Sequence, residues 1–234
     1  MAYLACCFAP LAISCSPLER ESSMMKSGLD GKAIYQWLPR AAQEGSLTLH
    51  RSHMVNIVTI GDSKYQVDVG FGGNGPVIPM KLDRSGTVQK HIQPATCRLQ
   101  WSNIDANTDP DQRLWVYEHR IHAGGEFRIT YCFTELEFLP SDYNLMNSYT
   151  STNSKSWFTK VIVGEKKILS EDGELVGNLI LGNNNLKWRI KGKKEREITF
   201  ATEEDRVRAI EEHFGIKLNQ AERDSVVGLS SEIK

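Results

Sequence analysis

The pattern of hydrophobic and polar positions divides the chain into stretches of different character. Residues 1–48 are weakly patterned, and only residues 31–44 have modest helical character, which Pro39 interrupts. From about residue 53 to 138, short runs rich in Val, Ile, Tyr, Trp and Thr alternate with clusters of Gly, Asp, Asn and Pro, which predicts an antiparallel barrel or sandwich. These runs are HMVNIVTI, KYQVDVG, ATCRLQWSNI, RLWVYEHRI and EFRITYCFTELEF.

The pattern changes after residue 139. Ser141 and Asp142 predict the start of a short helix that runs toward Tyr149, and a loop rich in Ser, Thr and Asn follows it. Four more strand-like runs lead to a helix that Thr202 caps and that ends at Gly215. The run NQAERDSVVGL predicts one further short helix. We therefore expect an α+β protein with an irregular N-terminal remnant (1–48), an antiparallel β-barrel domain (49–138) and a lid-like, mixed α/β domain (139–234).

Composition narrows the classes of function. The chain has 234 residues, of which 40% are hydrophobic and 24% charged, as in an ordinary globular protein. Its net charge is -1, so nothing in it favours a nucleic acid or a membrane surface as partner. No apolar run approaches the roughly 20 residues that span a bilayer. The basic run RIKGKKER is typical of a solvated turn.

The five cysteines are an odd number and unevenly spaced, which does not indicate a disulfide framework. No CxxC pair is present, so we expect no metal site and a reducing, cytoplasmic setting. The first 15 residues are apolar. They could form a short signal peptide, although they lack the basic residues that precede the apolar core of one. The alternative is a leader without fixed structure.

The stretch SHMVNIVTIGDSKYQVDVGFGG, residues 52–73, predicts a β-hairpin. Gly61 and Asp62 form its two-residue turn, with glycine at the position that requires positive φ. Ile60 then pairs with Ser63, and this register fixes every pair farther from the turn.

That register brings a histidine and an aspartate together. Asp68 lies opposite Val55, and His53 shares a face with Val55 because it is two residues away. His53 and Asp68 are thus diagonal neighbours with Cβ atoms about 7 Å apart. A three-residue turn would place them on opposite faces. A carboxylate fixes the tautomer of a histidine that takes a proton from a thiol or hydroxyl. The alternative is a strand-end histidine satisfied by a local hydrogen bond.

Glycines follow the aspartate at once. Gly70, Gly72 and Gly73 allow the backbone to turn tightly and to approach a ligand closely. The run does not fit the GxGxxG fingerprint, because no predicted helix follows it. It indicates a place where the chain leaves a strand beside a pocket.

Three blocks together resemble the arylamine N-acetyltransferase family, especially its fungal members. The first is residues 52–82, with a histidine before an apolar strand and then VDVGFGG. The second is ELEFLPSDYNLMNSYTSTNSKSWFTK, and the third is EEDRVRAIEEHFGIKL. The blocks occur in the family's order, and the resemblance covers about residue 50 to the end.

The resemblance implies a helical first domain, a β-barrel and an α/β third domain. It also implies a Cys-His-Asp triad that passes an acyl group from acetyl-CoA or another acyl-CoA to an arylamine or hydrazine nitrogen, in xenobiotic metabolism. Acyl-CoA is a cosubstrate there, and no permanently bound cofactor is implied. His53 and Asp68 match the family's histidine and aspartate, and Phe71 matches an aromatic that lines the acceptor pocket. The positions that match its coenzyme A contacts are Gly72, Gly73, Thr152 and Ser156.

The nucleophile is not visible in the sequence. The family carries its cysteine in an Arg-Gly-Gly-x-Cys motif upstream of the histidine, and this chain has no Arg-Gly-Gly. Cys6, Cys7 and Cys15 lie upstream but lack that context, and the first two have no basic neighbour to favour a thiolate. Cys97 and Cys132 lie on predicted strands, where a buried inert thiol is normal.

Three interpretations remain open. In the first, the chain is an N-terminally truncated or altered version of a working enzyme, with most of the helical domain missing. In the second, it is a catalytically inactive relative that binds CoA or a partner. In the third, it is an unrelated β-rich binding module, in which His53 and Asp68 are not in contact.

Overall fold

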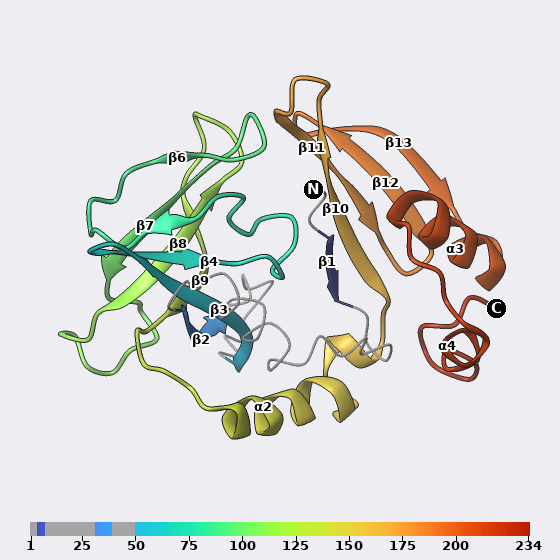
Figure 1. Ribbon diagram of the computed structural model, residues 1–234, viewed down its shortest axis with the longest axis horizontal. Coiled ribbons are helices and arrows are strands. Elements are labelled where there is room, and N and C mark those ends of the chain that lie inside the picture. Colours follow the sequence, from blue (N-terminus) through green and yellow to red (C-terminus); the bar gives the residue numbers. More distant parts are fainter. Residues whose placement is uncertain (1–3, 8–30, 39–49) are drawn as a thin grey trace. The chain divides into compact units, whose positions relative to one another are not determined.

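The computed structural model describes residues 4–7, 31–38 and 50–234, and the side chains from His53 onward. The chain forms two compact units (Figure 1). One comprises residues 15–146, and the other comprises residues 1–14 and 147–234, so that the boundary falls within helix α2 (Pro140–Thr152). Among the described residues, no helix has the length and apolar character needed to cross a membrane.

The unit of residues 15–146 contains an eight-stranded antiparallel sheet in the order β5-β4-β3-β2-β9-β8-β7-β6. All five strands predicted between residues 53 and 138 are present in it. Within the described residues, no hydrogen-bonded pair joins the edge strands β5 and β6, and closure into a barrel stays a prediction. The strands are β2 (Gly31–Leu38), β3 (His50–Ile60), β4 (Ser63–Val67), β5 (Met80–Lys81), β6 (Gln89–Lys90), β7 (Thr96–Ser102), β8 (Leu114–Arg120) and β9 (Arg128–Phe133).

One face of this sheet carries the larger buried cluster of the unit, and a smaller cluster of Leu114, Val116 and Cys132 lies on the opposite face. Alternate residues of β3, β7, β8 and β9 point to the face of the larger cluster, as the period of a strand requires. Met80 from β5 packs in the same cluster as Cys97 and Leu99 from β7, so the sheet curves around its core. The other buried members are Val55, Ile57, Trp115, Tyr117, Tyr131 and Phe133.

The helical character predicted for residues 31–44 is wrong at Gly31–Leu38, which form strand β2. This strand pairs with β3 along its whole length and with β9 at its end. Ile34, Tyr35 and Trp37 are residue types that favour strands, and pairing on both sides overrides a weak helical pattern. The segment expected to be irregular also contains β1 (Leu4–Cys7), which belongs to the other sheet.

The second unit has a five-stranded antiparallel sheet in the order β1-β10-β11-β12-β13. Its predicted strands and helices are present, and Thr202 caps α3 with a capping box. A π-helical turn continues α3 and stops at Gly215, which is left-handed with φ 74°. The elements are β10 (Val163–Leu169), β11 (Leu175–Leu181), β12 (Asn185–Ile190), β13 (Lys193–Thr199), η1 (Trp157–Thr159), α3 (Glu203–Ala209), η2 (Ile210–Phe214) and α4 (Gln220–Asp224).

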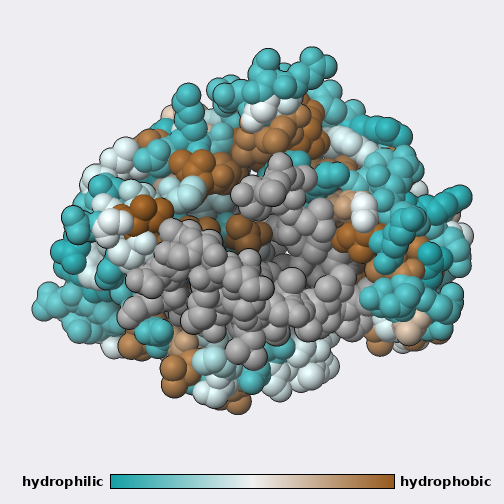
Figure 2. Space-filling model, in the orientation of Figure 1, coloured by the Kyte–Doolittle hydropathy of each residue, from teal (hydrophilic) through white to brown (hydrophobic). Residues whose placement is uncertain are grey.

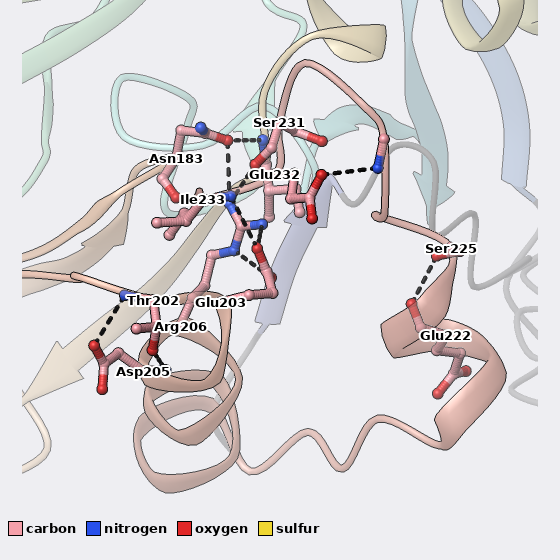
Figure 3. Close-up of polar contacts among 12 residues, drawn as sticks. Asn183, Thr202, Glu203, Asp205, Arg206, Glu222, Ser225, Ser231, Glu232 and Ile233 are labelled. Atoms are coloured by element: carbon pink, nitrogen blue, oxygen red, sulfur yellow. Dashed lines mark hydrogen bonds and ion pairs between the residues drawn. The ribbon is translucent and has the colours of Figure 1, made fainter.

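A buried arginine ties this unit together (Figure 3). The Arg206 side chain is fully buried and forms a two-point ion pair with Glu203. Its Nη1 donates to the backbone oxygen of Asn183 at 2.7 Å and to that of Ser231 at 2.9 Å. Because these partners lie on α3, after β11 and near the C-terminus, one guanidinium cross-links three segments that are distant in the sequence.

Large hydrophobic side chains are exposed on and just before α2. Leu136 is 63% exposed, Leu139 62% and Leu145 76%. Figure 2 shows hydrophobic residues along the lower edge of the view, where Figure 1 draws α2, and also elsewhere on the described surface.

Candidate active site

The hairpin has the predicted register. Ile60 pairs with Ser63 and Asn56 with Val67, and Gly61 in the turn has φ 57°. The next positions along the two strands bring His53 and Asp68 together. Nε2 of His53 lies 3.0 Å from each carboxylate oxygen of Asp68. The predicted contact is therefore present, which excludes the interpretation that required its absence.

Asp68 is held by backbone groups as well as by the histidine. The N–H groups of Gly70 and Phe71 both donate to its Oδ1, at 3.0 and 3.1 Å. Its side chain is 1% exposed, whereas that of His53 is 17% exposed. The chain turns back on the carboxylate directly after β4, and there is room for a side-chain Cβ at Gly70 at an ordinary van der Waals distance from the imidazole. A Cβ at Gly70 would lie 3.5 Å from Cε1 of His53.

The carboxylate stays ionised despite its burial. Burial is the largest influence on Asp68 and raises its pKa. The charge and hydrogen bond of His53, together with hydrogen bonds from Gly70 and Tyr131, outweigh burial, so the pKa of this carboxyl lies below its usual value. An ionised carboxylate only accepts hydrogen bonds, so Nε2 of His53 carries the proton. The lone pair is then on Nδ1, which is the nitrogen able to take a proton from a nucleophile.

Aromatic rings surround the pair. Phe71 meets the ring of His53 edge-on, with centroids 5.4 Å apart, and lies 5.0 Å from the ring of Tyr131. Tyr117 stacks on Tyr131 at 4.8 Å. These rings pack beside the imidazole and exclude water from that side. The lower local dielectric constant strengthens the electrostatic interaction of His53 with Asp68.

Tyr131 is a site residue that the sequence did not reveal. Its ring is fully buried, and its hydroxyl accepts a hydrogen bond from the amide of Gln66. The hydrogen bond between Tyr131 and Asp68 is then donated by the hydroxyl, because the carboxylate only accepts. Tyr131 lies on β9, and only the pairing of strands distant in sequence brings β9 near Asp68.

The four positions predicted to contact coenzyme A lie in two different parts of the chain. Gly72, with φ 96°, begins a turn in which the N–H of Gly75 donates to its carbonyl oxygen at 3.0 Å, and Gly73 lies inside that turn. Thr152 and Ser156 belong to the other unit, where both hydroxyls donate to backbone carbonyl oxygens, at 2.6 and 2.7 Å. The roles of these four residues in binding coenzyme A stay predictions.

The two cysteines whose side chains are described, Cys97 and Cys132, are not poised as nucleophiles. Cys97 and Cys132 are free and buried, as expected for strand positions. Burial raises the pKa of both thiols, that of Cys132 to about 12. The backbone of Cys6 and Cys7 lies on β1, in the unit that does not contain His53. Cys15 lies outside the described residues.

A histidine paired with a buried aspartate is the arrangement that lets a base activate a nucleophile in many enzymes. A family model described as N-acetyltransferase matches residues 40–223. The chain therefore belongs to the arylamine N-acetyltransferase family.

Relatives and solved structures agree with this assignment. N-malonyltransferase FDB2 from Gibberella moniliformis is 36% identical over 183 residues, which cover 75% of this chain and 53% of the relative. The protein of that name from Fusarium pseudograminearum is 36% identical over 184 residues, with the same coverage. The chain thus spans about half the length of the curated relatives it matches.

The fold is that of solved arylamine N-acetyltransferases. The Salmonella typhimurium enzyme superposes with a TM-score of 0.71 at 19% identity, covering 88% of this chain and 71% of that one. The Mycobacterium marinum enzyme in complex with CoA has a TM-score of 0.65 at 22% identity, covering 89% of this chain and 68% of that one. At these identities the likeness shows the shared fold.

Proposed function

We propose that the chain is the base-bearing part of an acyltransferase that moves an acyl group from acyl-CoA to the nitrogen of an arylamine or hydrazine. The contact between His53 and Asp68 carries this proposal, because it leaves Nδ1 of the histidine as the proton acceptor. The curated relatives are named N-malonyltransferases, which favours a malonyl donor over acetyl. The family's closed barrel and a cytoplasmic setting are parts of the same proposal.

The proposed reaction has two halves. A cysteine thiolate attacks the thioester carbonyl of acyl-CoA, a thioester to the enzyme forms, and the CoA sulfur leaves with a proton from the His53 imidazolium. The amine nitrogen then attacks the enzyme thioester and gives its proton to Nδ1 of His53, and the amide product leaves as the thiolate is restored. Asp68 stabilises the imidazolium in both halves. Phe71 lines the acceptor pocket, and Gly72, Gly73, Thr152 and Ser156 contact coenzyme A.

A second candidate follows from the sequence of the nucleophile region. The chain has no Arg-Gly-Gly, and both cysteines whose side chains are described are buried with raised pKa values. An inactive relative that binds CoA or a partner is therefore the alternative to an enzyme.

Release of CoA by the purified chain tests the two candidates. Acetyl-CoA and malonyl-CoA are each supplied with an arylamine, and the free thiol is measured. Turnover that His53→Ala abolishes supports the enzyme, and His122→Ala is the matched control, because His122 is an exposed histidine in the same unit. Absence of turnover in a folded chain that still binds CoA by calorimetry supports the inactive relative.

A further inference from the structure

A buried histidine outside the triad forms a hydrogen bond with Gly75, in the loop that carries Phe71. His91 follows β6 and is 7% exposed. Its Nε2 lies 2.8 Å from the carbonyl oxygen of Gly75. A carbonyl oxygen only accepts, so this nitrogen carries a proton and donates to Gly75. The ring of His119 meets the ring of His91 edge-on at 4.6 Å and fixes its orientation by packing.

The loop between the hairpin and Gly75 is therefore held at both ends. At its start, Asp68 accepts hydrogen bonds from the N–H groups of Gly70 and Phe71. At its end, the N–H of Gly75 closes a turn and the carbonyl of Gly75 binds His91. Phe71 lies between these two fixed points, so its ring position depends on both.

Gly75 lies tightly against Phe71. A Cβ placed on Gly75 would lie only 2.7 Å from the Cβ of Phe71, a separation that real Cβ atoms essentially never show. The turn is therefore wrapped tightly against the first side-chain atom of Phe71. The Phe71 ring in turn meets the His53 ring edge-on at 5.4 Å. Hydrogen bonding by His91 is thus linked to the imidazole of the site through two close contacts.

We propose that His91 is a positioning residue that sets the Phe71 ring and, through it, the fit of the aromatic acceptor amine. The part of the inference that concerns the acceptor amine rests on the proposed function. The part that concerns the position of Phe71 beside His53 is independent of it. The proposed role requires a hydrogen-bond donor to the carbonyl oxygen of Gly75 at the position of Nε2. Glutamine can present an amide N–H there, whereas leucine fills the space without a donor.

The test compares His91→Leu with His91→Gln, and His122→Leu is the control because His122 is exposed. We expect His91→Leu to raise the KM for the arylamine about tenfold, the effect of one lost buried hydrogen bond, with little change in the rate of enzyme acylation. His91→Gln should stay within about threefold of the starting KM. If His91 serves stability alone, His91→Leu should lower the free energy of unfolding without raising the KM for the arylamine more than it changes the rate of enzyme acylation.

A second readout does not require turnover. The His53 Hε1 proton reports the ring current of Phe71, so its NMR shift should move in His91→Leu and stay in His91→Gln and His122→Leu. Gly75→Ala should also move the His53 Hε1 signal, because the new methyl group pushes directly on Phe71. This variant replaces His91→Leu as the test if His91→Leu does not fold. An unchanged His53 signal in folded His91→Leu, or equal displacement in His91→Gln, overturns the proposal. If the unmodified chain shows no turnover, the proposed function fails and the NMR comparison alone decides the role of His91.

Discussion

Replacement of Asp68 by asparagine should reverse the tautomer of His53. Both backbone donors, Gly70 and Phe71, bind Oδ1 of Asp68. An asparagine at this position keeps its amide oxygen there, which places its NH₂ group where Oδ2 lies now, 3.0 Å from Nε2 of His53. Nε2 also lies 3.0 Å from the oxygen, but an Nε2–H would meet the NH₂ group donor to donor, so we expect the tautomer in which Nε2 accepts from the NH₂ group and Nδ1 carries the proton. Nδ1 can then no longer act as the base.

The sizes of the effects follow from the contacts that Asp68 makes. Hydrogen bonds to a charged group are each about 1 kcal/mol stronger than neutral ones, and the carboxylate accepts from four groups: His53, Gly70, Phe71 and Tyr131. The neutral amide regains part of this through its smaller desolvation cost, so we expect a loss of about 1–2 kcal/mol in the free energy of unfolding. The wrong tautomer should cost far more in activity, about 10⁴-fold in kcat, or about 5 kcal/mol in the barrier.

Long-range ¹H–¹⁵N correlation of the imidazole measures the tautomer directly. The expected result is an Nε2–H histidine in the unmodified chain and an Nδ1–H histidine in Asp68→Asn. Asp62→Asn is the matched control, because Asp62 is exposed in the hairpin turn. A folded Asp68→Asn protein in which His53 keeps its proton on Nε2 would refute the reasoning, whatever happens to activity.

Three further predictions concern stability and reactivity. Arg206→Met should lower the free energy of unfolding, measured in urea, by about 3 kcal/mol. This value is at the low end for breaking a buried ion pair, because the partner Glu203 is 22% exposed. Arg208 is exposed, so Arg208→Met should change the free energy of unfolding little. Burial raises the pKa of Cys132 to about 12, so only about one thiol in 10⁴ is ionised at pH 8, and alkylation should require unfolding. The pKa of Asp68 is lowered in the folded chain, so its stabilisation is complete above the unfolded value near 3.8 and is lost as pH falls through the folded value; acid titration of stability should flatten in Asp68→Asn.

The sequence alone determined the hairpin that carries the base. A two-residue turn and a side-chain period of two fix which residues face one another, and neither depends on the rest of the fold. Residue spacing is therefore sufficient to pair His53 with Asp68. The capping box at Thr202 and the stop at Gly215 were predictable for the same reason, because their hydrogen bonds and backbone angles are local.

Only the tertiary structure decided what surrounds that base. The helical prediction for strand β2 is wrong because the strand's own pattern is weak, and the pairing that stabilises it comes from β3 and β9. Tyr131 reaches Asp68, and His91 reaches Gly75, through strand order and loop packing between segments far apart in the sequence. Residue spacing carries no record of such contacts, because they form only when the curved sheet brings these segments to one place.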